Sequence, residues 1–320
     1  MPRFKVLLTD YAWPDVDIER RELAKMDAEL IVAERTDVES LSALAGEHEV
    51  DAIMTNWAKV PSGVIGASRK CRIVSRLGIG LDNIDVDYCT QNGIPVTNVP
   101  DYCLIEVAEH AMALLLALGR KIAFYHHQTK SRRYELQAGP PLRRIEGQTL
   151  GLIGLGNIGR KMAEKARCFG LKVIATDPVA PPVEGVEMCA LDALLAAADY
   201  VSLHVPLVEA TRHLIGAEQL AKMKPTAYLI NTARGGLVDA QALAAALMAG
   251  HIAGAALDVQ DPEPPDLDQT PYSDPRVIVT PHAAFASLES LENLRTRTAR
   301  QVAARLTGAE PESVANPSVL

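Results

Sequence analysis

The stretch that decides the fold is Gly154-Leu155-Gly156-Asn157-Ile158-Gly159, in the middle of the chain. Before it, the apolar residues Thr149–Ile153 are typical of a buried strand, and after it Ile158–Phe169 has helical spacing. A second strand is expected over Lys172–Thr176, and Asp177 follows at its end. Strand, glycine-rich turn, helix, strand and acid in this order predict the βαβ unit of a Rossmann-type dinucleotide-binding domain.

The three glycines have separate physical tasks. Gly154 suits a tight turn, Gly156 lets the backbone approach a pyrophosphate, and Gly159 lets the helix pack closely on the strand. The pyrophosphate would rest on the helix N-terminus at Asn157 and Ile158, where N–H groups and the helix dipole favour negative charge. Asp177 would accept hydrogen bonds from both ribose hydroxyls and repel a 2′-phosphate. A glycine pattern alone can be a structural turn, but the complete order of elements favours a cofactor site that prefers NAD over NADP.

Length and composition favour a globular protein of two domains. The chain has 320 residues, of which 48% are hydrophobic, 22% charged and only 4% aromatic, so the core is expected to be mainly aliphatic. A net charge of −8 argues against a nucleic-acid partner bound through its phosphates. We interpret the one short basic concentration as a solvated connection, with an anion or partner patch as the alternative; it consists of Lys130, Arg132, Arg133, Arg143 and Arg144.

Cysteine usage and the apolar runs predict a cytoplasmic protein without a membrane partner. The five cysteines are scattered, odd in number and lack a Cys-x-x-Cys motif, so they are expected to be small buried residues in a reducing compartment. The N-terminus runs directly into a strand without a signal sequence. The most apolar run, Ala111–Leu118, is far shorter than the roughly 20 residues that span a bilayer.

Two series of alternating strands and helices predict two doubly wound parallel sheets. The glycine motif normally occupies the first βα turn of its sheet, yet here it opens a second series at Thr149. We therefore assign residues 101–286 to the NAD-binding domain. A helix expected over Leu288–Leu306 would return to the first series, so residues 1–100 and 287–320 would form a discontinuous substrate-binding domain.

A long helix is expected from Leu104 to about His126. Its Ala111–Leu118 segment is apolar nearly all round, which indicates burial on several sides. The helix would either pack under the second sheet or lie in a subunit interface.

Three polar residues of the second domain each follow an expected strand, where the ligand crevices of open α/β sheets form. Arg234 lies in Asn231-Thr232-Ala233-Arg234-Gly235-Gly236, Glu263 in Asp261-Pro262-Glu263-Pro264, and His282 in Thr280-Pro281-His282-Ala283. With the glycine motif and with Arg76-Leu77-Gly78-Ile79-Gly80-Leu81-Asp82-Asn83-Ile84-Asp85, these segments resemble the D-isomer-specific 2-hydroxyacid dehydrogenase family over nearly the whole chain. The resemblance implies an NAD-binding domain inserted into a flavodoxin-like substrate domain, an active site in the cleft between them, and a homodimer.

The three residues fit that chemistry. Hydride transfer between nicotinamide and the C2 carbon of a hydroxy acid requires proton exchange at the C2 oxygen, which His282 can perform near neutral pH. Glu263, on the other ring nitrogen, would fix the tautomer and favour the imidazolium form. Arg234 offers a planar two-point donor to the substrate carboxylate and can polarise the keto oxygen.

Each of the three also has a structural alternative. Arg234 could pair with Asp239, Glu263 could be one acid of the solvated loop 261–268, and His282 could be a satisfied core histidine. Their joint occurrence with a nicotinamide site favours catalysis.

The family pattern implies further roles. Ile79 and Gly80 match the loop whose N–H groups hold the substrate carboxylate. Asp258 matches the acid that holds the nicotinamide carboxamide, with a helix cap or loop hydrogen bond as its alternative. Backbone positions that line the cofactor are matched by Val205, Thr232 and Ala233. Trp57 and Phe285 could line the substrate side-chain pocket, although packing roles are equally expected.

A rival function comes from the segment His282-Ala283-Ala284-Phe285 and the helix after it. This segment resembles the C-terminal-binding-protein branch of the family, which includes NAD-sensing corepressor scaffolds. The catalytic trio does not separate an enzyme from a scaffold with little turnover, because the scaffolds keep it. No metal is expected, since His110, His204 and the pair His126 and His127 lack ligand spacing.

Overall fold

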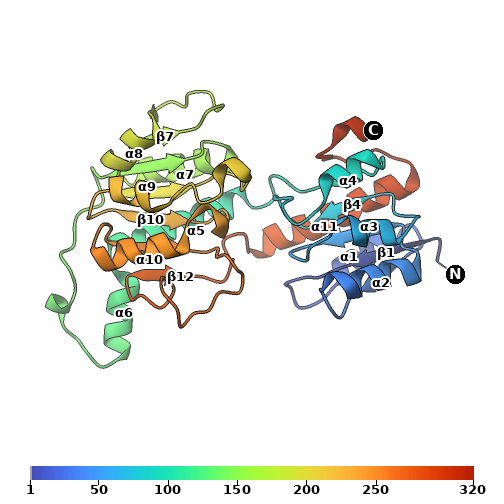
Figure 1. Cartoon of the computed structure of the whole chain (residues 1–320), viewed down its shortest axis with the longest axis horizontal. Coiled ribbons are helices and arrows are strands. Elements are labelled where there is room, and N and C mark those ends of the chain that lie inside the picture. Colours follow the sequence, from blue (N-terminus) through green and yellow to red (C-terminus); the bar gives the residue numbers. More distant parts are fainter. Residues whose placement is uncertain (1) are drawn as a thin grey trace. The chain divides into compact units, whose positions relative to one another are not determined.

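The computed structural model describes residues 2–320, which form two compact units (Figure 1). The first unit comprises the chain up to Tyr102 together with Ser287–Leu320, and the second unit is Cys103–Ala286. Each unit has a parallel sheet with helices on both faces, so the predicted fold class of two doubly wound α/β domains is confirmed.

The first unit contains a five-stranded sheet in the order β2-β1-β3-β4-β5. All its strand pairs are parallel, and the order reverses between β1 and β3, as in flavodoxin-like folds. The strands are short and largely buried, as the apolar runs predict. Their bounds are β1 Phe4–Leu8, β2 Ala28–Val32, β3 Ala52–Thr55, β4 Val74–Arg76 and β5 Val96–Thr97.

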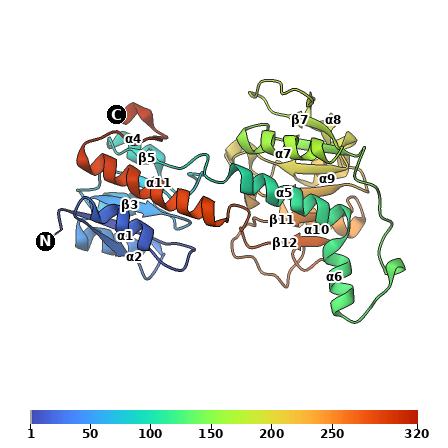
Figure 2. The ribbon, with the colours of Figure 1, turned by 180° about the vertical axis from the view of Figure 1, so that it is seen from behind.

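Two layers of helices cover this sheet. One layer packs its apolar side chains, such as Leu41 and Val64, against Leu7 and Ile53 of the sheet; it consists of α2 Val38–His48, α3 Ser62–Ala67 and α4 Val86–Gln91. The opposite layer, visible in Figure 2, consists of α1 Asp17–Ala24 and α11 Leu288–Thr307. The Ser287 side chain caps the start of α11, and Gly308 ends it in a left-handed conformation.

The second unit contains a seven-stranded parallel sheet in the order β12-β11-β10-β9-β6-β7-β8. The chain leaves β6 first toward β7 and later toward β9, so the strand order reverses at β6, which the glycine motif follows. The bounds are β6 Thr149–Ile153, β7 Lys172–Thr176, β8 Glu187–Met188, β9 Tyr200–Leu203, β10 Tyr228–Asn231, β11 Gly254–Leu257 and β12 Val277–Val279.

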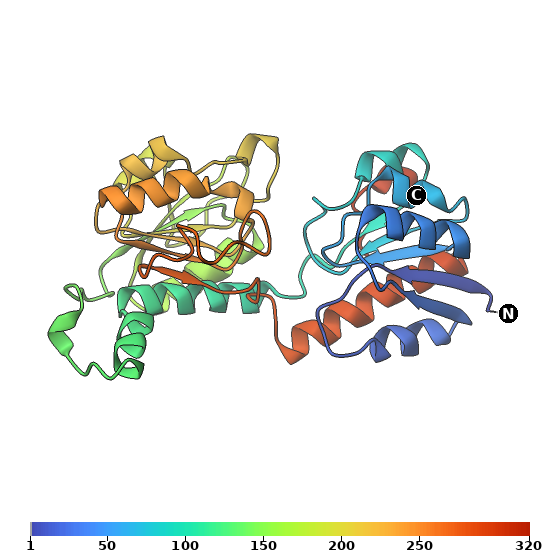
Figure 3. The same cartoon turned by 60° about the horizontal axis from the view of Figure 1, so that its bottom comes forward.

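Two helices lie on one face of this sheet, and three lie on the other. The face that carries Leu150 and Leu152 is covered by α5 Leu104–Gly119 and α7 Asn157–Cys168. The opposite face is covered by α8 Leu191–Ala197, α9 Ala217–Lys222 and α10 Ala240–Ala249. Figure 3 shows α5 running along its face of the sheet, and its residues Ala108, Ala111 and Leu115 are fully buried. Of the two positions expected for this apolar helix, packing against the sheet is the one observed.

The single long helix expected from Leu104 to about His126 is wrong. Helix α5 ends at Gly119, and a separate helix, α6, begins at Ile122 and ends at Lys130. Lys121 has a left-handed backbone (φ 56°), which interrupts the helical hydrogen bonds, and its ammonium group bonds the Tyr228 hydroxyl at the start of β10. Figure 2 shows α6 and the segment after it projecting from the rest of the second unit.

Candidate active site

The glycine loop, Gly154–Gly159, has the geometry that the sequence predicts. Gly154 is left-handed (φ 97°), and a Cβ there would lie 2.5 Å from the carbonyl oxygen of His204. A Cβ on Gly159 would collide with the Gly154 carbonyl, so this glycine is needed where α7 packs on the strand end. A Cβ on Gly156 would meet only open space, and α7 begins there without a side-chain cap. The first N–H groups of α7 therefore face space that suits a phosphate.

Asp177 is fixed beside this loop. Its Oδ2 accepts a hydrogen bond from the Leu155 N–H (2.8 Å), and its Oδ1 accepts from the N–H groups of Val179 and Ala180 (both 2.9 Å). Desolvation by burial opposes the charge, but these three donors outweigh it and lower the pKa of Asp177 below its ordinary value. The carboxylate is thus held ionised, with one of its about four acceptor sites left for a ligand.

Arg160 is a cation that the sequence analysis missed. It directly follows the last glycine of the motif, its Nε donates to the Leu155 carbonyl (3.0 Å), and its charge contributes to lowering the pKa of Asp177. The signal was present as a basic residue in the first turn of the predicted helix. The Arg160 side chain reaches the loop because long side chains on a helix point back toward the helix N-terminus.

The expected cofactor-lining positions follow neighbouring strands at the same edge of the sheet. Val205 follows β9 and packs beside Gly154, whereas Thr232 and Ala233 follow β10. The buried Asn231 side chain holds the latter segment by accepting from the Ala233 N–H (3.0 Å) and donating to the Arg234 carbonyl (2.8 Å). Within residues 2–320 the buried Thr232 hydroxyl has no hydrogen-bond partner, as expected for a group that faces a ligand.

Asp258, at the end of β11, organises the segment that carries His282. Its carboxylate accepts hydrogen bonds from the Thr280 hydroxyl and from the N–H groups of Ala283 and Ala284, and its own carbonyl accepts from the His282 N–H (2.7 Å). These bonds hold His282 in a left-handed conformation (φ 52°), which is uncommon for histidine. Asp258 therefore makes the loop hydrogen bonds that were considered as its structural alternative.

His282 and Glu263 are brought together from separate segments. The distance from His282 Nδ1 to Glu263 Oε2 is 2.9 Å, and the two side chains are 22% and 33% exposed. The other carboxylate oxygen, Oε1, accepts from the Gln260 N–H (2.8 Å). Glu263 is therefore held in place and is not simply one solvated loop acid, and His282 is partly exposed rather than a core histidine.

Gln260 is a second residue that the sequence analysis missed. Its buried amide donates to the carbonyls of Leu257 (3.1 Å) and Thr280 (3.2 Å), and so ties the end of β11 to the end of β12. The only indication in the sequence was that Gln260 is a polar residue between Asp258 and the acidic loop 261–268. Gln260 acts through Glu263, because it fixes the segment that orients this carboxylate.

Arg234 lies in the loop after β10, close to the segment that carries Glu263. Its Nη1 donates to the Ala233 carbonyl (2.8 Å), and a Cβ on the next residue, Gly235, would collide with the main chain of Gln260. Gly235 is thus required for this close approach. The pairing considered with Asp239 is not formed, because the Asp239 side chain accepts hydrogen bonds at the start of α10.

The other two predicted substrate residues, Ile79 and Gly80, belong to the first unit. They follow β4, and their carbonyls accept hydrogen bonds from the side chains of Asn98 (2.8 Å) and Arg76 (3.1 Å). In the second unit, the Phe285 ring lies edge-on to the His282 ring with centroids 6.0 Å apart.

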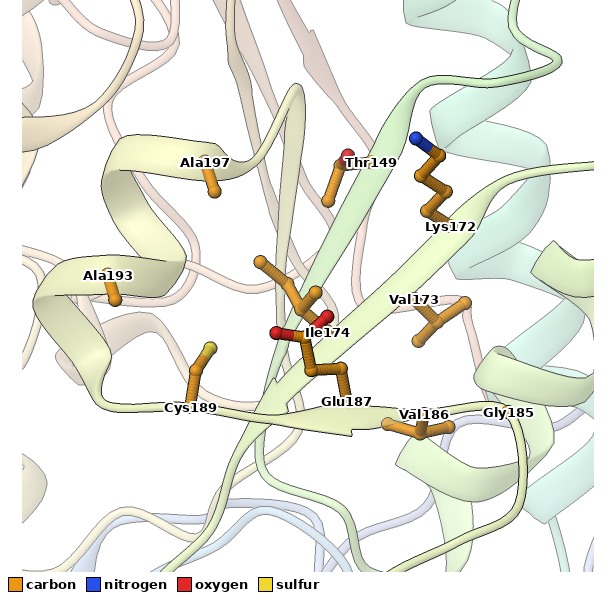
Figure 4. A pocket seen from close by; sticks show the side chains of 10 residues that line it. All are labelled: Thr149, Lys172, Val173, Ile174, Gly185, Val186, Glu187, Cys189, Ala193 and Ala197. Atoms are coloured by element: carbon orange, nitrogen blue, oxygen red, sulfur yellow. The ribbon is translucent and has the colours of Figure 1, made fainter.

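A pocket of about 670 Å³ lies elsewhere in the second unit (Figure 4). Thr149 and Lys172, the first residues of β6 and β7, line it together with Glu187 of β8 and Ala193 of α8. The glycine loop and Asp177 instead follow the ends of β6 and β7. The pocket is therefore separate from the predicted cofactor site.

The cysteines and histidines differ in part from expectation. Cys71, Cys89 and Cys103 are buried, and burial raises the pKa of the Cys71 and Cys89 thiols to about 12. The expectation of burial is wrong for Cys168, which is exposed near the end of α7, where the apolar face of the helix turns away from it.

Burial lowers the pKa of His204 to about 4, and its Nε2 lies 2.9 Å from the Ser202 hydroxyl. No group of three metal-binding side chains occurs among residues 2–320.

Comparison with known proteins identifies the family. Residues 112–284 match the family model of the D-isomer specific 2-hydroxyacid dehydrogenase, NAD binding domain. The chain belongs to this family. Its members transfer hydride with a nicotinamide cofactor, so the protein is an NAD-dependent oxidoreductase that acts on 2-hydroxy acids.

Two relatives that are similar to the chain in sequence carry different enzyme names. A hydroxypyruvate reductase of Thermotoga maritima is 38% identical over 91% of this chain and 94% of its own length. A D-3-phosphoglycerate dehydrogenase of Mycobacterium tuberculosis is 40% identical over 83% of this chain, but the match spans only 51% of that longer protein.

Solved structures of the family are similar over nearly their whole length. D-lactate dehydrogenase of Aquifex aeolicus, in complex with NAD and lactic acid, has a TM-score of 0.85 at 28% identity and covers 98% of this chain and 99% of its own. An NADPH-dependent glyoxylate/hydroxypyruvate reductase of Sinorhizobium meliloti, with NADP and malonate, has a TM-score of 0.89 at 29% identity, covering 99% and 98%.

Proposed function

We propose that this protein interconverts a small D-2-hydroxy acid and its 2-keto acid with NAD(H), using His282 as the acid/base, Glu263 as its partner and Arg234 to hold the substrate carboxylate. The observation that carries the proposal is the 2.9 Å contact between His282 Nδ1 and Glu263 Oε2. It joins two residues 19 positions apart at the carboxyl ends of strands in a Rossmann-type sheet. This is the arrangement that orients a catalytic histidine.

The proton chemistry follows from this contact. Because Nδ1 is bound to Glu263, His282 would exchange the proton with the C2 oxygen of the substrate through Nε2. The Glu263 carboxylate, bound to Nδ1, would hold the ring so that Nε2 faces the substrate. Arg234 would bind the carboxylate through two parallel N–H donors, which orients C2 and polarises the keto oxygen. Bound NADH supplies the hydride.

The residues around the glycine loop fit NAD. Gly154, Gly156 and Gly159 with the α7 N–H groups at Asn157 and Ile158 would hold the pyrophosphate, and Asp177 the adenosine ribose. Val205, Thr232, Ala233, Asp258 and His282 would line the remainder of the cofactor. We propose a preference for NADH over NADPH because the ionised Asp177 would repel a 2′-phosphate. Arg160 beside it moderates that repulsion, so we expect a preference of about tenfold rather than exclusion.

An NAD-sensing scaffold is the second candidate, and only the edge-on contact between His282 and Phe285 favours it. That contact matches the C-terminal-binding-protein-like segment of the sequence. The relatives reported above are named as reductases and dehydrogenases. We therefore favour the enzyme.

The test is turnover of a panel of glyoxylate, hydroxypyruvate and pyruvate with NADH, followed by variants of the pair. We expect measurable kcat with at least one keto acid and a loss of about 10²- to 10⁴-fold in His282→Ala. In Glu263→Gln, which keeps the shape but removes the charge, kcat should fall while NADH binding persists. NADH binding without turnover would support the scaffold. Unchanged rates in His282→Ala would remove this residue from its proposed role.

We also propose a homodimer in which a second copy covers the projecting arm, residues 120–147. No residue of α6 is buried, and the arm exposes Ile122 (57%), Tyr134 (94%) and Leu136 (75%). Exposed apolar side chains that are grouped on one segment indicate a protein–protein contact. Light scattering should give twice the chain mass, and Tyr134→Asp with Leu136→Asp should shift the protein toward monomer. A monomeric unmodified protein at micromolar concentration would contradict this.

The sequence-based predictions of a cytoplasmic location and of no nucleic-acid or membrane partner stay predictions. Within residues 2–320, no helix has the length and apolar character needed to cross a bilayer.

A further inference from the structure

The loop after β4 in the first unit, Leu77–Leu81, is held from its interior side by a buried arginine. Arg76, the last residue of β4, is only 6% exposed. Its Nε donates to the Gly80 carbonyl (3.1 Å), and its Nη1 donates to the Leu77 carbonyl (2.5 Å). Nη1 also lies within reach of the Thr55 carbonyl and of the Asn56 side-chain oxygen (3.4 and 3.2 Å), at the end of the neighbouring strand β3. One guanidinium group therefore fixes both ends of the loop.

The middle of the loop is held by the segment after β5, which lies on the other side of β4 from the end of β3 that Arg76 contacts. The Asn98 amide donates to the Ile79 carbonyl (2.8 Å), and the Val99 N–H donates to the Gly78 carbonyl (3.1 Å). Asn98 is itself fixed, because its Oδ1 accepts from the Ser313 hydroxyl (3.0 Å). Four successive carbonyl groups, from Leu77 to Gly80, are thus occupied by donors from the body of the first unit.

This arrangement determines where the N–H groups of the loop point. In a trans peptide the C=O of one residue and the N–H of the next lie on opposite sides of the chain. The carbonyls of Gly78 and Ile79 point toward the segment after β5, so the N–H groups of residues 79 and 80 both point away from that segment, whereas the N–H groups of residues 78 and 81 point away from Arg76. None of these four N–H groups has a protein acceptor within residues 2–320. A row of successive N–H groups of this kind attracts an anion.

Gly78 makes the close position of the arginine possible. A Cβ on this residue would lie 2.9 Å from both Cζ and Nη1 of Arg76, closer than real Cβ atoms approach other heavy atoms. A larger residue at position 78 would have to displace the guanidinium group. The glycine and the arginine therefore act together.

We propose that Arg76 and Asn98 are positioning residues for the substrate carboxylate: they hold the loop carbonyls so that the N–H groups of Ile79 and Gly80 face that anion. Neither side chain touches the substrate. The positive charge of Arg76, behind the loop, adds attraction for the same anion. The proposal rests on the proposed function, because it takes the anion to be the carboxylate of a 2-keto acid.

The test is the variant Arg76→Lys, which keeps the charge but loses the planar donor fork. With NADH and the best keto acid of the panel, we expect KM to rise on the order of 10- to 100-fold while kcat changes much less. The inhibition constant of oxamate, a carboxylate-bearing analogue of keto acids, should rise by the same factor. The Kd for NADH should not change.

A second variant acts on the middle of the loop. Asn98→Asp preserves shape but places a carboxylate oxygen against the Ile79 carbonyl, where the amide now donates. We expect KM and the oxamate inhibition constant to rise by about tenfold. This variant carries the test if Arg76→Lys fails to fold.

Arg295→Lys is the matched control. Arg295 is also 6% exposed and also belongs to the first unit, but it holds Glu19 (2.8 Å) and Asp15 (2.9 Å) instead of a loop. This control should lower Tm and leave KM and oxamate inhibition unchanged.

Normal oxamate inhibition in folded Arg76→Lys or Asn98→Asp would overturn the proposal, as would an equal loss in Arg295→Lys. If the unmodified protein neither turned over a keto acid nor bound oxamate, the proposed function itself would be contradicted.

Discussion

The glycine loop of the second unit and the Leu77–Leu81 loop of the first unit both present N–H groups just beyond a strand, yet they are built differently. The glycine loop obtains its donors from the start of α7 and its shape from glycines that admit neighbouring main chain. The Leu77–Leu81 loop leads into no such helix, and its carbonyls are held by Arg76 and Asn98. A local backbone motif shapes one loop, whereas side chains from two strand ends hold the other.

The largest effect should come from a substitution at Gly159, where a side chain would meet main-chain atoms. In Gly159→Ala the new methyl group meets the Gly154 carbonyl, which cannot move without displacing β6. We expect the Kd for NADH to rise roughly 10- to 100-fold and the second unit to lose about 1–3 kcal/mol of stability. Fluorescence titration with NADH and thermal unfolding would measure the two effects.

Gly156→Ala is the matched variant, because its Cβ would enter open space. Its Tm should stay normal while its affinity for NADH falls. An unchanged affinity would contradict the placement of the pyrophosphate at this residue.

A smaller effect, on KM for the keto acid rather than on the Kd for NADH, is expected from Gly78→Ala. The added methyl group meets the Arg76 guanidinium, a side-chain group that can shift at some cost. KM for the keto acid should rise about tenfold, and the Kd for NADH should remain normal. Steady-state kinetics would check this, and a weakened NADH complex would argue that the two loops do not act separately.

Removing the acid beside the glycine loop should change cofactor choice. Asp177→Ala removes an ionised carboxylate that accepts hydrogen bonds from three N–H groups. Because the repulsion of the 2′-phosphate is then lost, the ratio of NADPH affinity to NADH affinity should rise by about tenfold. Paired titrations with both cofactors would measure the ratio. Equal affinities in the unmodified protein would refute the preference proposed for Asp177.

The smallest effect is a loss of folding stability at acidic pH. The main chain of His204 lies against Gly154, and burial lowers the pKa of the His204 ring from 6.5 to about 4. As the pH falls from about 6.5 to 4, the unfolded chain therefore binds this proton before the folded protein does, and stability decreases. Arg76 keeps its charge throughout this range, so the Leu77–Leu81 loop lacks this sensitivity. Unfolding between pH 4 and 7 should show a flatter profile in His204→Gln, and an identical profile would exclude this histidine as the cause.

How far the sequence could predict each region depends on the range of the contacts. The glycine loop and Asp177 were visible because strand, glycine turn, helix, strand and acid follow one another along the chain. The break between α5 and α6 was not visible, and Lys121 at this break binds Tyr228 of a distant strand. Arg160 and Gln260 were missed because a charged or amide side chain shows its role only once its partner is placed.

The sequence by itself determined the two doubly wound sheets and the glycine loop, because apolar periodicity and glycine spacing reflect the local geometry of strands, turns and helices. The resemblance of its ordered motifs indicated the family and supported the prediction of Arg234, Glu263 and His282 as the residues for hydride and proton chemistry. Only the tertiary structure decided that Glu263 meets His282, that Asp258 and Gln260 hold their segments, and that Arg76 lies beneath the Leu77–Leu81 loop. Hydrogen bonds to main-chain carbonyls and N–H groups leave no sequence signature, because every residue offers the same acceptor and nearly every residue the same donor.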